Sequence, residues 1–438
     1  MHAKLLAIPA ILAITLLLCR AGTAADPPFP TTLVFPPYFH SYGIQRATEA
    51  KLFMLLPMQT RFSNPQGLAV TKMRTRDDTT TEKDDDEVTV YGVNSGRGEI
   101  IYNTSMYGLA LWGKKGGGKE EMRDPVGVAC DEEGNVYICD TGNDRIVRLF
   151  NPMKKVRFVG HLGVGALRRP THLVLDGKGV LYVSDSGNDR IAVLDRDGNL
   201  VREIRQAGPV SVSSPSGLAL NMVNERWRYY RANLLFFLNR GGRELVRLNL
   251  DDGSAVVVRP SRLLKLSPSY EFMASDYYAN LYLTDPVRGT IDKYDYNLNY
   301  IVSFGKSGSR DREFEEPRGI CIWKRYGQTL VAEKSGAQYY WVGTDFSGIS
   351  LVVKKAGACL LKGRLTEQSF LSLYYVRGAD TLETIFKKRR AFPGALETAF
   401  RIRSPLSEDG CLLFAAEPTY SSYTYFIKSE RIGLGAKP

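Results

Sequence analysis

Residues 124–149 read DPVGVACDEEGNVYICDTGNDRIVRL, and residues 169–194 read RPTHLVLDGKGVLYVSDSGNDRIAVL. Both copies run from a proline through a short apolar stretch, a D-x-x-G turn, a second apolar stretch and a D-[TS]-G-N-D-R-I connection into a third. A period in the forties built of short strands is typical of a β-propeller blade. One small sheet cannot bury both of its faces, so such blades stack around a central axis.

The proline that opens each first strand also phases four weaker copies. These prolines are Pro65, Pro125, Pro170, Pro215, Pro268 and Pro317. We therefore predict an all-β chain with a six-bladed β-propeller over 62–350. Period-two alternation continues without the repeat over 351–438, which predicts a small C-terminal antiparallel β-sandwich. In the N-terminal segment 26–61, the apolar run LFMLLPM (52–58) is expected to be an outer strand that pairs with the last blade and closes the ring.

The two clear copies resemble the NHL repeat, with Asn143-Asp144-Arg145 and Asn188-Asp189-Arg190 at the Asn-His-Leu position. The resemblance covers roughly 62–350 and implies a six-bladed propeller of the secreted or periplasmic type. Among six-bladed relatives, amidating lyases hold a histidine-bound metal at the axis, and some lactonases depend on calcium. Some cytoplasmic relatives bind RNA.

The connection between the second and third strands carries an acid and an arginine in each clear copy. Asp140 precedes Arg145, and Asp185 precedes Arg190. Catalysis or metal binding is one interpretation of these acids. Because the residues recur as parts of the blade, we predict instead that each acid accepts turn N–H groups and pairs with its arginine. Gly142 is expected to have a positive φ.

Residues 1–25 have the pattern of a signal peptide: Lys4, an apolar run, then small residues. We expect a secreted or periplasmic protein with no transmembrane segment after cleavage. Cleavage lowers the net charge from +11 to +9, spread along the chain, and we expect no nucleic-acid partner. Pairing of Cys359 with Cys411 stays open.

Few residues support a catalytic prediction. The mature chain keeps three histidines, His40, His161 and His172, whereas zinc needs three or four converging ligands. No G-x-S-x-G elbow is present, and no histidine has a recognisable serine partner for a triad. No catalytic residue, cofactor or metal is therefore predicted; calcium or zinc belongs to the enzyme alternative.

Two surfaces are candidates for binding. The residues after each phasing proline should form the rim of one axial mouth, a ring of polar groups that suits a small ligand. The alternative is that most of these residues only cap their own strands and that water fills the channel. The ring consists of Gln66, Thr171, His172, Ser216, Tyr270 and Arg318.

The opposite face carries an insertion at 221–233 and a shorter run at 323–326, and both mix aromatic rings with cations. Such a mixture suits stacking combined with charge contacts, and it equally suits covering a blade edge. The residues are Arg226, Trp227, Arg228, Tyr229, Trp323, Arg325 and Tyr326.

Together these features predict an exported, non-enzymatic binding or scaffold protein, monomeric, with a protein, peptide or glycan partner. The alternative is a metal-dependent propeller enzyme of the amidating-lyase or lactonase kind. Metal content of the purified protein distinguishes the two.

Overall fold

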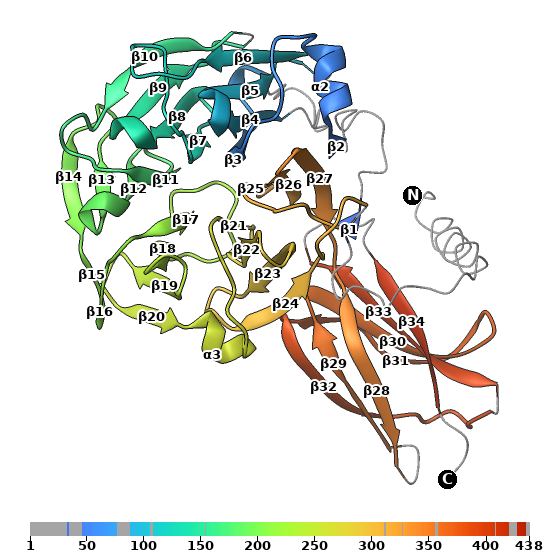
Figure 1. Cartoon of the computed structure of the whole chain (residues 1–438). Helices are drawn as coiled ribbons and strands as arrows, with labels where there is room; N and C mark the ends of the chain where they lie inside the picture. Colours follow the sequence, from blue (N-terminus) through green and yellow to red (C-terminus); the bar gives the residue numbers. More distant parts are fainter. Residues whose placement is uncertain are drawn as a thin grey trace.

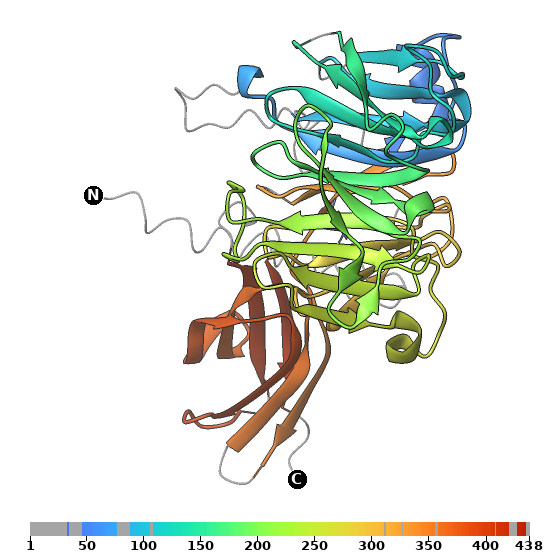
Figure 2. The same ribbon diagram turned by 90° about the vertical axis from the view of Figure 1, so that its left-hand side faces the viewer.

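The computed structural model describes residues 33–34, 46–76, 88–105, 108–153, 155–310, 312–325, 327–354, 358–407, 409–419 and 427–434. Within these residues, six antiparallel sheets surround a central axis, and a two-sheet domain projects from one side of the ring (Figures 1 and 2). The expected signal peptide, residues 1–25, lies outside the described residues. Among the described residues, no helix is long and apolar enough to span a bilayer.

The first three blades each contain four strands in sequence order. Blade 1 has β3 (Pro65–Thr71), β4 (Thr89–Asn94), β5 (Glu99–Asn103) and β6 (Leu109–Gly113). Blade 2 has β7 (Val128–Cys130), β8 (Asn135–Asp140), β9 (Arg145–Phe150) and β10 (Arg157–Leu162). Blade 3 has β11 (Pro170–Leu175), β12 (Leu181–Asp185), β13 (Arg190–Leu194) and β14 (Leu200–Ile204).

Blades 4 and 5 follow the same order, after a small hairpin of β15 (Gln206–Ala207) and β16 (Val210–Ser211). Blade 4 has β17 (Ser216–Asn221), β18 (Leu234–Asn239), β19 (Glu244–Asn249) and β20 (Ala255–Val258). The short helix α3 (Pro260–Leu264) leads to blade 5, with β21 (Met273–Ser275), β22 (Leu281–Asp285), β23 (Thr290–Tyr294) and β24 (Tyr300–Phe304).

Blade 6 is completed by the N-terminal segment. Its own strands are β25 (Ile320–Trp323), β26 (Gln328–Glu333) and β27 (Gly336–Val342). Two short strands, β1 (Leu33–Val34) and β2 (Arg46–Ala47), pair antiparallel with β27. The first strands of successive blades contact one another, and β25 contacts β3, so the ring closes.

The apolar run expected as the closing strand forms a helix instead. Helix α2 (Glu49–Leu55) begins at Thr48, whose side chain accepts the Lys51 N–H, and it buries Leu52. A run of Leu, Met and Phe fits either a strand or a helix, and the N-cap decides in favour of the helix. The strand prediction for 52–58 is therefore wrong.

The connection after β8 differs from its predicted geometry at one residue. Residues Thr141–Asn143 form a 3₁₀ turn, and Asp144, not Gly142, has a positive φ of 54°. Glycine is required at position 142 for another reason: a Cβ there would lie 2.7 Å from Arg123 Cγ and 2.9 Å from Arg123 O. Close packing against the preceding chain therefore explains this glycine.

The C-terminal domain is a sandwich of two sheets around one apolar core. One sheet has β28 (Phe346–Val353), β29 (Ala358–Leu365) and β32 (Gly394–Arg401). The other has β31 (Asp380–Ala391), β30 (Ser369–Arg377), β33 (Gly410–Pro418) and β34 (Lys428–Gly433). The expected boundary at 351 falls inside β28, because alternation alone does not tell which sheet a strand joins. Cys359 lies on β29 and Cys411 on β33, so the two cysteines are on opposite sheets and form no disulfide with each other.

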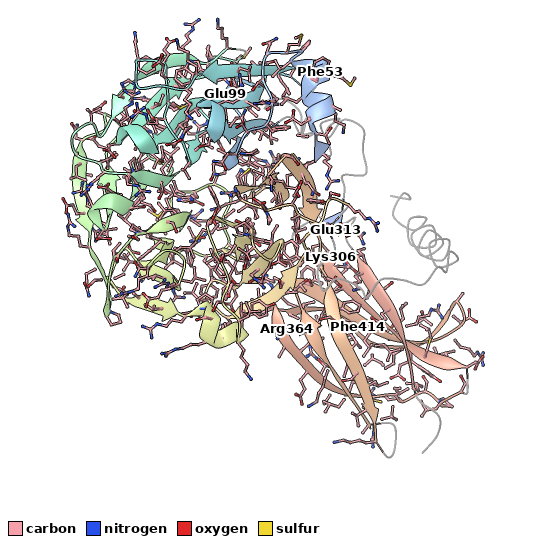
Figure 3. The ribbon with its side chains drawn as sticks, viewed as in Figure 1. Phe53, Glu99, Lys306, Glu313, Arg364 and Phe414 are labelled. Atoms are coloured by element: carbon pink, nitrogen blue, oxygen red, sulfur yellow. The ribbon has the colours of Figure 1, made fainter. Side chains whose placement is uncertain are left out.

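A buried ion pair joins the sandwich to blade 5. Lys293, which is 0% exposed, places its ammonium 2.5 Å from Glu367 Oε2. Asn280 donates to the same carboxylate at 3.0 Å. At the edge of the contact, Arg364 donates to the Tyr300 carbonyl. Figure 3 labels Arg364 on the sandwich, near the propeller. A buried ion pair and an exposed hydrogen bond at its edge thus join the sandwich to the propeller.

Candidate functional site

The acids of the repeat bind the turns of their own blades. Asp140 is 0% exposed and accepts from the Arg123 backbone N–H and from Arg145 Nε, both at 2.7 Å. Asp185 makes the same contacts with the Arg168 N–H and Arg190 Nε, both at 2.7 Å. Each acid thus accepts hydrogen bonds within its turn from a backbone N–H and from an arginine.

The other blades keep the position and change the chemistry. In blades 1 and 4 an asparagine accepts the equivalent N–H and donates to a glutamate, as Asn94 does to Glu99. In blade 6, Glu333 accepts from the Glu315 N–H at 3.0 Å and from Gln338 Nε2. Burial raises the pKa of Glu333 to about 7. Polar contacts at this position therefore persist although the charges vary.

The first strands of all six blades line an axial channel of about 240 Å³. Among the predicted ring residues, His172 faces this channel. Its ring meets Phe272 edge to face with centroids 4.5 Å apart, and neither ring nitrogen has a hydrogen-bond partner among the residues that the structure describes. Burial lowers the pKa of His172 to about 3, so the imidazole is neutral at physiological pH.

The rest of the predicted ring does not converge on the channel. Gln66 donates to Asn64 at 2.9 Å, and the Thr171 hydroxyl contacts that of Ser186. Tyr270 is buried against Asp292 and Tyr294. These side chains satisfy their hydrogen bonds within the blades.

Two further ring residues lie at the starts of their blades. Ser216 begins β17 and is half-buried. Arg318 lies 3.4 Å from Glu271, a residue of the preceding blade. Glu271 directly follows the predicted ring residue Tyr270, but this carboxylate was not itself predicted.

At the other end of the axis, the turns between first and second strands of five blades surround a second cavity of about 320 Å³. We call this cavity the loop-face mouth. Its lining includes Arg74 (blade 1), Glu133 (blade 2), Asp176 (blade 3), Trp227 (blade 4) and Trp323 (blade 6). The structure thus brings together the two aromatic insertions that the sequence placed on this face.

Two arginines contact the Trp227 ring. Arg226 lies 4.8 Å and Arg325 lies 4.9 Å from the ring centroid, within the range of cation–π attraction. Arg226 is exposed and pairs with no carboxylate of the described residues. Trp227 therefore orients two cations, one of which is available to a ligand.

The remaining predicted loop residues have other roles. Arg228 donates to the Glu225 carbonyl. Tyr229 packs among Tyr230, Tyr277 and Tyr278 beneath Arg390 of the sandwich, away from the mouth. Tyr326 lies outside the described residues.

An ion pair separates the mouth from the axial channel. Lys324 of blade 6 lies 2.6 Å from Glu225 of blade 4 and also donates to the Leu220 carbonyl at 2.9 Å. Both charged residues line both cavities. No pattern in the sequence indicates this pair, because its two members are far apart along the chain.

The mouth has an acidic side as well. Glu132 and Glu133 each lie 3.3 Å from Arg74, and burial raises the pKa of the neighbouring Asp131. Carboxylates from blades 2 and 3 thus face the cations of blades 4 and 6. Among the described residues, no group of three or more His, Cys, Asp or Glu side chains is arranged to hold a metal ion.

No protein-family model and no curated protein matches the chain. Solved structures do match. A gluconolactonase from Xanthomonas campestris aligns with a TM-score of 0.45 at 12% identity, covering 73% of this chain and 99% of its own. A virginiamycin B lyase from Staphylococcus aureus gives 0.41 at 14%, covering 58% and 78%. Regucalcin, a calcium-binding protein from Agrobacterium tumefaciens, gives 0.41 at 12%, covering 62% and 82%.

These neighbours are propeller-type proteins. The names of these three proteins denote two enzymes and a calcium-binding protein. At these scores the likeness is one of blade architecture, and no activity is carried over to this chain. The NHL assignment stays a prediction.

Proposed function

We propose that this chain is an exported binding protein whose loop-face mouth holds an extended peptide segment of a partner protein. The observation that carries the proposal is the convergence of turns from five blades on one cavity that contains two indole rings and charges of both signs. Concave sites with a few placed polar groups are the usual form of a ligand site. Aromatic and arginine side chains are the residues that most often dominate binding energy.

A peptide fits this mouth better than a glycan does. Sugars stack on free indole faces, whereas two guanidinium groups already contact the Trp227 ring. A peptide offers carbonyl and carboxylate groups to Arg226 and a basic side chain to the carboxylates opposite. Both signs of charge around one opening also disfavour a polyanionic ligand.

The test begins with a displayed peptide library selected against the mature protein. Affinities of the selected peptides are then measured for Trp227→Ala, Trp323→Ala and the matched control Trp112→Ala. Trp112 stacks on Phe158 at a centroid distance of 6.3 Å and is not part of the mouth. Each mouth variant should lose about tenfold or more in affinity, while Trp112→Ala binds normally.

Other results would overturn the proposal. Binding on a glycan array without peptide binding would assign the mouth to sugars. Equal loss in all three variants would indicate a general effect on folding. Stoichiometric calcium or zinc together with turnover of a lactone or peptidyl substrate would establish the enzyme alternative.

A further inference from the structure

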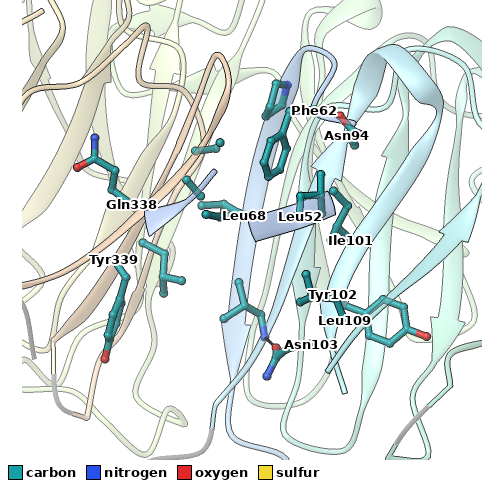
Figure 4. A pocket seen from close by; sticks show the side chains of 18 of the residues that line it. Leu52, Phe62, Leu68, Asn94, Ile101, Tyr102, Asn103, Leu109, Gln338 and Tyr339 are labelled. Carbon is teal, nitrogen blue, oxygen red and sulfur yellow. Dashed lines mark hydrogen bonds between the residues drawn. The ribbon is translucent and has the colours of Figure 1, made fainter. Parts of the chain in front are cut away.

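The seam between blades 6 and 1 is built differently from the other five. Within the described residues, each of the other seams contains a cluster of buried apolar side chains shared by the two blades. The seam between β27 and blade 1 instead contains a cavity of about 170 Å³, lined by β3, β4, β5, β26, β27 and helix α2 (Figure 4).

Two departures from the repeat create this cavity. Counted back from the acid or amide that ends each second strand, the second residue faces the preceding blade. It is Ile138, Val183, Phe237, Leu283 and Val331 in blades 2 to 6, and Gly92 in blade 1. The third residue faces the following blade. It is Tyr91, Tyr137, Tyr182, Phe236 and Tyr282 in blades 1 to 5, and Leu330 in blade 6.

Gly92 and Leu330, which are smaller than their counterparts in the other blades, therefore lie at the same seam. Elsewhere an aromatic ring from one blade packs beside an apolar side chain from the next, as Tyr137 does with Val183. Here Leu330 faces Gly92, and both line the cavity. A Cβ on Gly92 would lie 3.2 Å from Leu68 Cδ2, the tip of a flexible side chain. Backbone geometry therefore does not require glycine at this position, which lies in a strand with ordinary φ.

The lining is mostly hydrocarbon, and most of its polar groups are hydrogen-bonded; Gln338 Oε1 has no partner among the described residues. Figure 4 shows Leu52, Leu68 and Ile101 around the cavity, with Tyr339 on the opposite side. The Tyr102 hydroxyl accepts the Val156 N–H. The Asn103 amide accepts the Val90 N–H and donates to the Val88 carbonyl. An apolar cavity of about 150 Å³ stays dry and binds benzene, so this one has the size and lining for a small hydrocarbon group.

One cation lies at this cavity. Lys51 of helix α2 lines it, is partly exposed, and forms no ion pair with a carboxylate of the described residues. We propose that the seam cavity binds the hydrocarbon part of a small monoanionic amphiphile, a short-chain carboxylic acid, with its carboxylate at Lys51. This site is separate from the loop-face mouth and does not depend on the function proposed for it.

Hexanoate, hexanol and hexylamine are the probes, measured by calorimetry and by thermal shift on the full mature chain. Hexanoate should bind more tightly than hexanol, and hexylamine least. Lys51→Met should lower hexanoate affinity about threefold to fivefold, to the level of hexanol, because a partly exposed pair contributes modestly. Equal affinities for hexanoate and hexanol in the unmodified protein would overturn the anionic preference.

Restoring the repeat should fill the site. Gly92→Val and Leu330→Phe should each raise the melting temperature without ligand and abolish binding of all three probes. The matched control, Val183→Ile, adds a methylene to the packed seam between blades 2 and 3; it should lower stability and leave binding intact. Absence of any probe binding, or binding that survives both filled variants, would overturn the proposal.

Discussion

Blades 2 and 3 and the closing sector, where blade 6 meets blade 1, are made from the same repeat with different content. In blades 2 and 3 each buried carboxylate has an arginine at 2.7 Å, and the seam between the blades is filled. In the closing sector Glu333 has an amide in place of the arginine, the seam holds a cavity, and a separate segment of chain covers it. The charges and side-chain volumes of the repeat therefore differ between blades. The backbone N–H that the acid at the end of the second strand accepts is kept in both sectors.

The largest expected effect comes from removing the cover of the closing sector. Deletion of residues 31–59 takes away β1, β2 and helix α2, which leaves β27 as a free strand edge and exposes the apolar seam. We expect the deletion variant to aggregate and to lose its cooperative melting transition. Size-exclusion chromatography measures the aggregation, and calorimetry measures the transition.

The control for this deletion is a chain that begins at residue 31 and keeps β1. It should melt as a chain that begins at residue 26 does. A monomeric product that lacks 31–59 and still melts cooperatively would show that the ring does not need these strands for closure.

The next effect concerns the sector with paired charges. Asp140→Asn removes the charge that Arg145, with a side chain 12% exposed, contacts at 2.7 Å. We expect a loss of about 1–3 kcal/mol in the free energy of unfolding, because a buried polar partner is left unsatisfied. Urea denaturation measures this loss, and Asp185→Asn should reproduce it. Unchanged stability combined with lost ligand binding would contradict the structural role.

The blades could be predicted because the repeated positions in the sequence determine which residues of neighbouring strands pair. Once the prolines are phased, the acid at the end of the second strand and the arginine that follows must lie side by side. Comparing the residues two and three positions before this acid in all six blades would also have shown that Gly92 and Leu330 are smaller than their counterparts and lie at one seam.

Other features depend on the distances between blades and were not accessible. Glu225 and Lys324 meet across the axis although they belong to blades 4 and 6. Tyr270 turns into its own blade because its hydroxyl donates to Asp292 and is hydrogen-bonded to the Tyr294 hydroxyl there, which a strand-start position does not reveal. The helix at 49–55 was missed because its apolar run fits both periods, and the cap at Thr48 carried the deciding signal.

The smallest expected effect is on the acid of blade 6, Glu333. Replacing this carboxylate by an amide should stabilise the protein, whereas the same change at Asp140 should destabilise it. Burial raises the pKa of Glu333 to about 7, above the value near 4.5 of the unfolded chain. The folded state therefore holds this proton more tightly, and the stability that it contributes is fully present below about pH 4.5 and is lost as the pH rises through 7. Asp276, whose pKa burial raises to about 6, adds a second contribution of the same sign.

Glu333→Gln should remove the first contribution and leave the second. The new amide oxygen still accepts the Glu315 N–H, and its NH₂ group can donate to Gln338 Oε1, which has no partner in the described structure. At pH 8 we expect the variant to be more stable than the unmodified protein by on the order of 1–2 kcal/mol, with the difference vanishing near pH 4.5. Chemical denaturation between pH 4.5 and 8 measures it, alongside Asp140→Asn, which should be destabilising at both ends of this range. A Glu333→Gln variant that is less stable at pH 8 would mean that the ionised carboxylate is held by Arg46, the cation of β2 that lowers its pKa, and that the closing sector is paired in charge after all.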